Sequence, residues 1–388
     1  MAATTGAFAA VDQIIETAVN DGVVPGAVIL CADEGTTRLH RAFGARELEP
    51  QWREATNDTV YDIASVTKAV STTVLVMKAV GSGFMELDDP VSRHLPEFSG
   101  PGKDAVTVRH LLCHASGLPA HRPFHETTSD VARAAAAEPL INAPGAVSVY
   151  SDLGFILLGW MMERLMGSPL DDLFRMTVSE PLGLASTGFV NLGERGAPGL
   201  VVADHPVAPT ENSAVRGCLV KGEVDDLNAF AMGGVAGHAG LFSDAAGLAT
   251  IASALVDSWH GKSTHVRGGK SKRAKIRLRA GSALRRETGF ALSREVIREF
   301  WRPAGIDGST WWLGWDGPAS RHSQAGELLS RQAVGHLGFT GCSLWIDPER
   351  ALWIVLLTNR VHPKARPDPR FRLFRAAVHD AMLAALRA

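Results

Sequence analysis

The chain of 388 residues has 46% hydrophobic residues, 21% charged residues and a formal net charge of −2, a composition that excludes disordered and collagen-like proteins. No apolar stretch reaches the roughly 18 residues of a membrane-spanning helix, the first residues lack the basic start of a secretory signal, and the four scattered cysteines form no C-x-x-C pair. We therefore expect a cytoplasmic protein, or a periplasmic one if a leader has been removed, with no membrane span, no disulfide framework and no thiolate zinc site.

The first part of the chain predicts a helix, a hairpin and a second helix. Apolar residues recur at helical spacing over residues 8–19. Two short strand-like runs, residues 27–31 and 37–43, are joined by a turn and indicate a hairpin. Helical spacing returns over residues 65–80, with Ser65 in the first turn.

The rest of the chain predicts helices followed by strands. Residues 87–255 are mostly helical in pattern, with loops rich in proline and glycine between the helices. Short apolar runs at residues 333–337, 342–346 and 352–357 are separated by turns and indicate antiparallel strands. A helix over residues 371–386 closes the chain.

Strands near both ends and helices between them predict an α/β fold of the α+β type. We expect one antiparallel sheet built from both termini and flanked by helices, with an inserted, mostly helical lobe. Residues 1–388 would form a single catalytic domain, in which residues 1–80 and 287–388 are the α/β lobe and residues 81–261 the helical lobe. The cleft between two such lobes is where a site is expected.

One segment differs in charge from the rest. Residues 262–286 carry ten basic residues and no acidic one, and setting these ten aside leaves 29 basic against 41 acidic residues in the chain. Such a segment can bind nucleic acid by releasing counterions from phosphates, but this one has no aromatic residue for base stacking. We expect a solvated, mobile insertion and no nucleic-acid partner.

The strongest single motif is Ser65-Val66-Thr67-Lys68, which places a hydroxyl and an amine at i and i+3 on one helix face. The amine can take the hydroxyl proton if burial lowers its pKa, which makes Ser65 an activated nucleophile. The start of the helix also leaves the Ser65 N–H free to donate. The motif is common by chance, and a capped helix with an exposed lysine is the alternative.

Two further motifs accompany it. Tyr150-Ser151-Asp152 begins another predicted helix, and the Tyr150 phenol can exchange protons if Lys68 stabilises its anion; a loop tyrosine bonded to the backbone is the alternative. Residues 335–341, Gly-His-Leu-Gly-Phe-Thr-Gly, lie between two predicted strands and can offer the Phe339 N–H as an oxyanion donor. A plain hairpin with turn glycines is the alternative there.

The three motifs, in this order and at these separations, are more specific than any one of them. Together they resemble the serine β-lactamase and penicillin-binding protein superfamily, especially its class C and esterase-like branch, over nearly the whole chain. The likeness extends to residues 87–90, 110–119 and 357–360. It implies a β-lactamase-like fold and a small-molecule ester, amide or β-lactam substrate.

The resemblance also assigns catalytic roles. It implies Ser65 as the acylated nucleophile, and Lys68 with Tyr150 as the pair that takes the Ser65 proton and later protonates the leaving group. The Ser65 and Phe339 amides would form the oxyanion hole. No cofactor is implied, and we expect a monomer.

Departures from the family pattern bear on the substrate. The third motif reads His336-Leu337-Gly338 where Lys-Thr-Gly is usual, so a permanent cation becomes a group with a pKa near about 6.5 and a hydroxyl is lost. The second motif ends in Asp152 where Asn is usual, which removes two side-chain donors. These four residues are candidates for substrate binding. Because both usual carboxylate anchors are weakened, we expect neutral esters or amides to bind better than β-lactams or D-alanyl peptides.

A glycine-rich segment and a group of histidines are further candidate sites. The glycine-rich residues 233–240 can line the cleft, with His238 as a further substrate-binding candidate, or form a tight packing loop. A metal cluster can be imagined from clustered histidines and a cysteine, but no carboxylate pattern accompanies them and we expect no metal; the residues concerned are His110, Cys113, His114, His121 and His125. No G-x-S-x-G elbow and no complete phosphate loop occurs.

The sequence therefore predicts a serine hydrolase that works through a Ser65 acyl-enzyme. Carboxylesterase activity on small esters or amides is the first choice. A β-lactamase or D,D-peptidase, or a penicillin-sensing protein that is acylated without turnover, are the alternatives.

Overall fold

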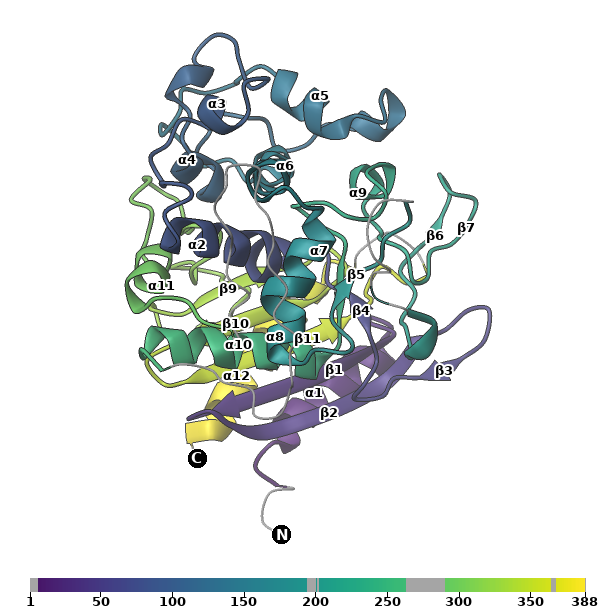
Figure 1. Cartoon of the computed structure of the whole chain (residues 1–388). Coiled ribbons are helices and arrows are strands. Elements are labelled where there is room, and N and C mark those ends of the chain that lie inside the picture. Colours follow the sequence, from purple (N-terminus) through teal and green to yellow (C-terminus); the bar gives the residue numbers. More distant parts are fainter. Residues whose placement is uncertain (1–5, 194–199, 201, 263–289, 364–367, 388) are drawn as a thin grey trace.

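Strands from both ends of the chain meet in one six-stranded antiparallel sheet of order β3-β2-β1-β11-β10-β9 (Figure 1). The computed structural model describes residues 6–193, 200, 202–262, 290–363 and 368–387. The N-terminal strand β1 pairs directly with the C-terminal β11, from Ala27 opposite Thr358 to Ala32 opposite Trp353. The strands of this sheet are β1 (Gly26–Asp33), β2 (Thr36–Glu47), β3 (Arg53–Glu54), β9 (Val334–Leu337), β10 (Ser343–Asp347) and β11 (Leu352–Thr358).

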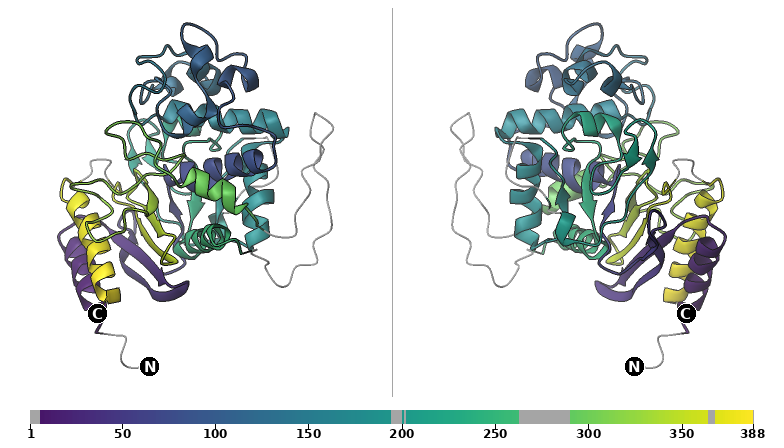
Figure 2. Two further views of the ribbon diagram at one scale, coloured as in Figure 1. Left: turned by 90° about the vertical axis from the view of Figure 1, so that its left-hand side faces the viewer. Right: turned by 90° about the vertical axis from the view of Figure 1, so that its right-hand side faces the viewer.

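The sheet is the middle layer of three. Every residue of β1 is buried because helices cover both of its faces. Its alternate residues Ala27, Ile29 and Cys31 pack in one apolar cluster with α1 (Ala9–Asn20) and α12 (Phe371–Arg387). The intervening residues face a second cluster that includes α2 (Val74–Gly81) and α10 (Ala245–Trp259). Figure 2 shows α1 and α12 side by side on one side of the sheet and the other helices opposite.

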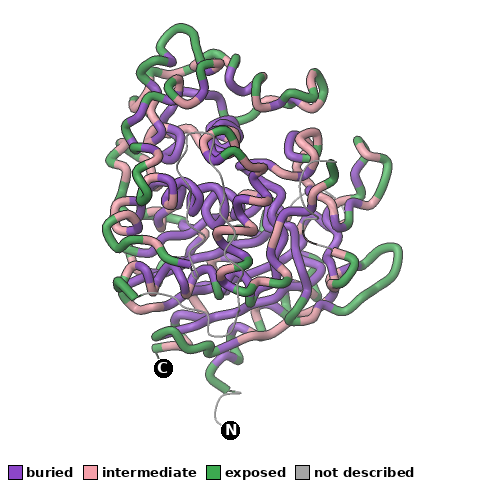
Figure 3. Tube along the Cα trace, in the orientation of Figure 1, coloured by how far each residue is buried: buried purple, intermediate pink, exposed green. Residues whose placement is uncertain are grey.

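The helical part of the chain is built around α6 (Asp152–Met166), most of whose residues are buried. Burial continues from α6 through α2 to the sheet, whereas the outer loops of the helical part are exposed (Figure 3). Among the described residues, no helix combines the length and hydropathy needed to cross a bilayer. The remaining helices are α3 (Val91–His94), α4 (Val108–Leu112), α5 (Val131–Ala137), α7 (Leu170–Phe174), α8 (Glu180–Leu182), α9 (Leu227–Ala231) and α11 (Arg294–Phe300).

Two small sheets complete the described structure. A three-stranded sheet of order β4-β8-β5 lies beside the helical part and leads directly into Ser65. A separate two-stranded ribbon stands at the edge of the molecule (Figure 1). Their strands are β4 (Tyr61–Asp62), β5 (Gly188–Phe189), β6 (Asn212–Ser213), β7 (Cys218–Leu219) and β8 (Leu241–Ser243).

The predicted fold class is confirmed, with two local differences. The helix expected over residues 65–80 contains a wider π-helical segment, η1 (Lys68–Thr73), in which the Thr73 hydroxyl donates to the Lys68 carbonyl at 2.7 Å. Such segments occur mostly at functional sites. In addition, α10 packs on β1 and β11 although the predicted boundary at residue 261 places it in the helical lobe. The basic segment expected over residues 262–286 lies, apart from Lys262, outside the described residues.

Candidate active site

Ser65 stands at a tight turn between β4 and the helix that follows. The preceding Ala64 has a φ of +47°, a left-handed conformation that costs a non-glycine residue about 1–3 kcal/mol and is found chiefly at functional sites. The Asp62 carboxylate holds this turn by accepting the Ala64 N–H at 2.8 Å. The turn leaves Ser65 partly exposed between buried neighbours.

Lys68 is fully buried behind Ser65, and its three N–H groups all have acceptors. Nζ donates to Ser65 Oγ at 2.9 Å, to Asp152 Oδ1 at 2.8 Å and to the His238 carbonyl at 2.9 Å. Burial acts to lower the pKa of Lys68, but Asp152 and Tyr150 outweigh it, so the pKa lies above its ordinary value. The condition set for an unprotonated lysine, that burial lowers its pKa, is therefore not met, and Lys68 rests as an ammonium.

Tyr150 lies beside this pair at the end of the loop that enters α6. Lys68 Nζ is 5.0 Å from the centroid of the Tyr150 ring. Burial raises the pKa of Tyr150, while the charge of Lys68 and contacts with Lys68 and Ser65 pull it down; the net shift is upward. The ring stacks on Trp311, with centroids 5.2 Å apart, and lies against His114. These contacts hold a protonated phenol close to Ser65.

The two residues predicted to supply the oxyanion hole, Ser65 and Phe339, lie on segments that contact each other. The β9–β10 turn is tied to β4, because the Thr340 hydroxyl donates to the Asp62 carbonyl at 2.8 Å. Gly338 permits the approach, since a Cβ there would lie 2.5 Å from the Ile63 carbonyl oxygen. Within the described residues, neither the Ser65 N–H nor the Phe339 N–H donates to a protein acceptor. Both amides are thus free to hold a developing negative charge.

A cleft of about 430 Å³ opens in front of Ser65. Its lining includes Ser65, Tyr150 and four consecutive residues of the third motif, His336 to Phe339. Asp152 and His238 are not among the lining residues that the structure describes. Asp152 instead pairs with Lys68, and the buried His238 side chain contacts Asp226 at 2.9 Å. The structure therefore places these two predicted substrate-binding residues behind Lys68 and not on the substrate side.

His336 is neutral in this cleft. The side chain is 1% exposed, and Nδ1 donates to the Leu337 carbonyl at 2.9 Å, which leaves Nε2 as an acceptor. Burial, together with the nearby Lys68 charge, lowers the pKa of His336 to about 3. The ordinary pKa expected for His336 from the sequence is therefore wrong, because the imidazolium would have to be buried beside another cation.

Three arginines line the same cleft, and the sequence reasoning missed them. They are Arg360, which follows β11, and Arg372 with Arg375, one turn apart on α12. None of the three forms an ion pair with Asp or Glu in the part of the chain described. Arg375 is buried and donates only to neutral oxygens, and burial lowers its pKa to about 9. The i, i+3 spacing on the last predicted helix was the available signal.

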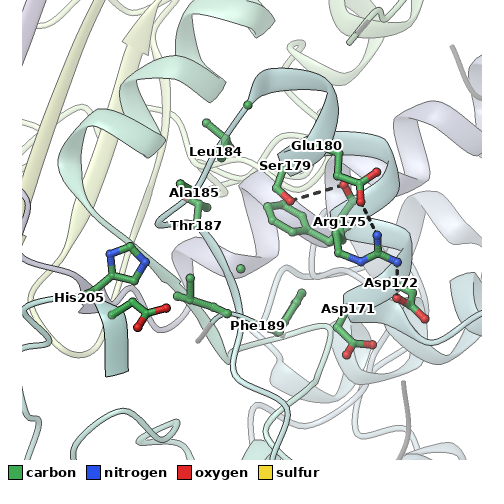
Figure 4. A pocket seen from close by; sticks show the side chains of 15 residues that line it. Asp171, Asp172, Arg175, Ser179, Glu180, Leu184, Ala185, Thr187, Phe189 and His205 are labelled. Carbon is green, nitrogen blue, oxygen red and sulfur yellow. Dashed lines mark hydrogen bonds and ion pairs between the residues drawn. The ribbon is translucent and has the colours of Figure 1, made fainter. Parts of the chain in front are cut away.

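A larger cavity of about 490 Å³ lies elsewhere, between α7, the π-helical η4 (Arg175–Ser179) and β5 (Figure 4). It contains none of the predicted catalytic residues. Phe174 and Phe189 lie on its apolar side, and Arg175 on its rim pairs with Asp172 and Glu180. Among the described residues its charged lining is mainly acidic, with Asp171, Asp172, Glu180 and Asp204 beside the single Arg175, whereas the predicted nucleophile Ser65 lines the smaller cleft.

The histidines weighed as metal ligands have other partners. His110 Nδ1 accepts from the Thr107 N–H at 3.2 Å and completes a helix cap, and His114 Nδ1 accepts from the Ser151 N–H at 3.1 Å. His121 instead faces Asp152, with Nδ1 3.5 Å from Oδ2. Over the described ranges, no group of three or more His, Cys, Asp or Glu side chains is placed to hold a metal ion.

Comparisons with known proteins agree with this geometry. The family model described as Beta-lactamase matches residues 11–377. A relative from Salmonella agona (strain SL483), named "Putative D-alanyl-D-alanine carboxypeptidase", is 31% identical over 343 residues, which cover 81% of this chain and 73% of the relative.

Solved structures share the fold at lower identity. "EstCE1, a hydrolase with promiscuous acyltransferase activity", has a TM-score of 0.70 at 22% identity and covers 98% of this chain and 100% of its own. The octameric penicillin-binding protein homologue from Pyrococcus abyssi has a TM-score of 0.69 at 22% identity, covering 96% of this chain and 76% of its own.

Proposed function

Because the chain belongs to the β-lactamase family of serine hydrolases, we propose that it is a carboxylesterase that hydrolyses small esters through a Ser65 acyl-enzyme. The observation that carries the proposal is the hydroxyl of Ser65 at 2.9 Å from Lys68 Nζ, beside two amides without protein acceptors. This arrangement combines an activated nucleophile with preorganised oxyanion donors.

The steps follow from the positions of the side chains. Ser65 Oγ attacks the ester carbonyl carbon, and its proton passes to Lys68, which Tyr150 assists. The Ser65 and Phe339 amides hold the oxyanion of the tetrahedral intermediate. Tyr150 protonates the leaving alkoxide, and water then releases the acyl group by the same steps in reverse order.

The third motif supports a neutral ester as the substrate. His336 is neutral and offers a lone pair, and Leu337 has no hydroxyl, so neither side chain can donate to a substrate carboxylate. A hydrogen bond to a charged group contributes about 1.5–3 kcal/mol. Losing one such contact corresponds to a roughly 10- to 150-fold lower rate of β-lactam acylation.

The test compares kcat/KM for a short-chain nitrophenyl ester with that for a chromogenic cephalosporin. We expect the ester to be the better substrate. In the double variant His336→Lys with Leu337→Thr, the ratio should move toward the cephalosporin by at least about tenfold. Leu337→Thr alone, which adds no buried charge, should move it in the same direction. A parent enzyme that prefers the cephalosporin contradicts the esterase proposal.

A second candidate function is D,D-carboxypeptidase activity, favoured by the arginines in the cleft. Arg360, Arg372 and Arg375 lack carboxylate partners among the described residues and can attract a substrate carboxylate. The Salmonella agona relative carries the name of such an enzyme. Release of D-alanine from an acylated D-alanyl-D-alanine peptide faster than hydrolysis of any ester in a panel would replace the first proposal with this one.

A further inference from the structure

A line of polar contacts runs from Ser65 to solvent. Ser65 Oγ accepts from Lys68 Nζ at 2.9 Å, and Lys68 Nζ donates to Asp152 Oδ1 at 2.8 Å. The other oxygen of that carboxylate, Oδ2, lies 3.5 Å from His121 Nδ1. Exposure rises along the line, from 0% for the Lys68 side chain through 19% for Asp152 to 49% for His121. The outer end of the line is therefore open to protons from water.

The backbone places His121 beside Asp152. The Ser151 hydroxyl donates to the Pro119 carbonyl at 2.7 Å, and the Asp152 N–H donates to the Ala120 carbonyl at 2.9 Å. These two bonds hold the loop that carries His121 against the first turn of α6. The exposed His121 side chain therefore starts from a backbone position within reach of the Asp152 carboxylate.

We propose that Asp152 and His121 are positioning residues for the acylation step: Asp152 takes a proton from Lys68 while Lys68 takes the proton of Ser65, and His121 controls this transfer from the solvent side. The inference rests on the proposed Ser65 acyl-enzyme, but not on whether the substrate is an ester or a peptide.

The need for this transfer follows from the proton count at Lys68. All three N–H groups of the ammonium are donated, so Nζ has no lone pair with which to accept the Ser65 proton. In the proposed step an Nζ–H bond breaks and an Oδ1–H bond forms on Asp152. The freed Nζ lone pair takes the proton of Ser65 as Oγ bonds to the carbonyl carbon. The Lys68 ammonium is restored. After Tyr150 has given its proton to the leaving group, the proton on Asp152 returns through Lys68 to the Tyr150 phenolate, so every group regains its resting form.

Tyr150 does not remove this need in the resting site. The raised pKa of Tyr150 leaves the phenol protonated, so it can donate to a leaving group but cannot first accept from Ser65. The Asp152 carboxylate is the base that Lys68 directly contacts.

The charge on His121 sets how readily Asp152 accepts a proton. An imidazolium at this position stabilises the Asp152 carboxylate and so opposes the transfer. The contact with Asp152 raises the pKa of His121 above its ordinary value; Asp226 adds to this shift, whereas burial and the neighbouring Arg122 oppose it. Burial and the neighbouring Asp226 act to raise the pKa of Asp152, but Lys68, His121 and His238 outweigh them and hold that pKa well below its usual range. Tyr150, His114 and His336 are the other titratable groups that interact with Asp152. We expect the reactivity of Ser65 to fall as the pH drops through the pKa of His121.

The test measures the second-order rate of Ser65 labelling by a fluorophosphonate at several pH values, in the full chain and in His121→Asn. We expect His121→Asn to retain, at about pH 5.5, at least about a threefold larger fraction of its rate at about pH 8 than the parent does. His125→Asn is the matched control, because His125 also lies near a carboxylate, with Nε2 3.8 Å from Glu126, but outside the line. The control should keep the pH profile of the parent.

A second variant separates positioning from simple structure. Asp152→Asn should slow labelling by about tenfold or more at every pH, because an amide cannot take the Lys68 proton. When His121→Asn is added to Asp152→Asn, it should no longer change the pH profile. The inference would be overturned if His121→Asn lost as much of its labelling rate at acid pH as the parent does. It would also be overturned if His121→Asn still changed the pH profile in the presence of Asp152→Asn.

The outcomes also distinguish this inference from the proposed function. Labelling that follows the expected pH dependence in a protein without esterase turnover supports the inference and rejects the carboxylesterase. Esterase turnover with a pH profile that ignores both variants rejects the inference and leaves the carboxylesterase standing. A Ser65 that is not labelled at any pH rejects both.

Discussion

Two buried cations lie near the Ser65 cleft, and their hydrogen-bond partners differ in charge. We call the part of the site around Lys68 and α6 the helical side, and the part around Arg375 and the β9–β10 turn the strand side. Lys68, on the helical side, has a carboxylate, a hydroxyl and a carbonyl as acceptors, and its pKa is raised. Arg375, on the strand side, donates to Gln324 Oε1 and to two backbone carbonyls, and burial lowers its pKa to about 9. One cation is neutralised within the protein, whereas the other is not.

The difference separates the two tasks of the cleft. On the helical side the charges cancel, so a proton can move between Ser65, Lys68 and Asp152 without creating a new net charge in a buried place. On the strand side Arg360, Arg372 and Arg375 outnumber Asp316, the one carboxyl group among the described lining residues of the cleft, and so leave a positive field. Chemistry therefore belongs to the helical side and recognition to the strand side.

Removal of the nucleophile should have the largest effect, because proton transfer on the helical side and substrate binding on the strand side both serve the attack by Ser65. Ser65→Ala should lower ester turnover by on the order of 10⁴-fold or more and abolish fluorophosphonate labelling. The control is Ser71→Ala, which removes a buried hydroxyl without a hydrogen-bond partner from the same helical segment. Labelling at another serine in Ser65→Ala would show that the nucleophile is misassigned.

Loss of a proton-transfer residue on the helical side should have the second largest effect. Lys68→Ala and Tyr150→Phe should each lower kcat by about 10²-fold or more, and the double variant should lose far less than the product, because the two residues act as a unit. Lys68→Ala also removes the buried partner of Asp152 and leaves it only the half-exposed His121, which should cost about 3 kcal/mol of unfolding free energy. Adding Asp152→Asn should recover that stability in urea unfolding, but not the activity. Multiplicative losses in kcat would contradict the pairing.

The charge on the strand side should matter less and only for anionic substrates. Arg372 is exposed, so Arg372→Gln should leave the fold intact. We expect kcat/KM for a substrate with a free carboxylate to fall about tenfold, and that for a neutral nitrophenyl ester to stay within about twofold. Arg370→Gln is the control, because Arg370 already pairs with Asp368 and does not line the cleft. Equal losses of kcat/KM on both substrates would contradict the assignment of substrate recognition to the strand side.

The smallest effect should be on the stability at acid pH, and it should arise from His379, whose pKa is influenced by Arg375. Burial and the charge of Arg375 lower the pKa of His379 to about 3. Between about pH 6.5 and pH 3 the unfolded chain binds a proton at this residue that the folded chain does not, so stability is lost as the pH falls through this window. His379→Gln should reduce the loss of unfolding free energy between about pH 7 and pH 5 by about 1–2 kcal/mol. An identical loss in parent and variant would contradict the assignment.

Much of the fold was predictable because its signals are local. The hairpin of β1 and β2, the three C-terminal strands and the closing helix are present at nearly the predicted positions. The helix after Ser65 was predicted with regular spacing, and the widened turn at Lys68–Thr73 was not. That segment depends on a hydroxyl bonding to a carbonyl five residues away, which apolar periodicity does not report.

The sequence by itself determined the core of the site: Ser65 and Lys68 share a helix face, and Tyr150 and residues 336–339 belong to motifs whose order and spacing indicate one family. The tertiary structure added the three arginines to the cleft and placed Asp152 and His238 behind Lys68. Only the tertiary structure decided the charges of the site residues. Asp152 lies against Lys68 and keeps it protonated, whereas His336 is buried beside the same cation and stays neutral. The physical reason is that a pKa depends on burial and on charges brought from distant parts of the chain, and neither is encoded in the spacing of a motif.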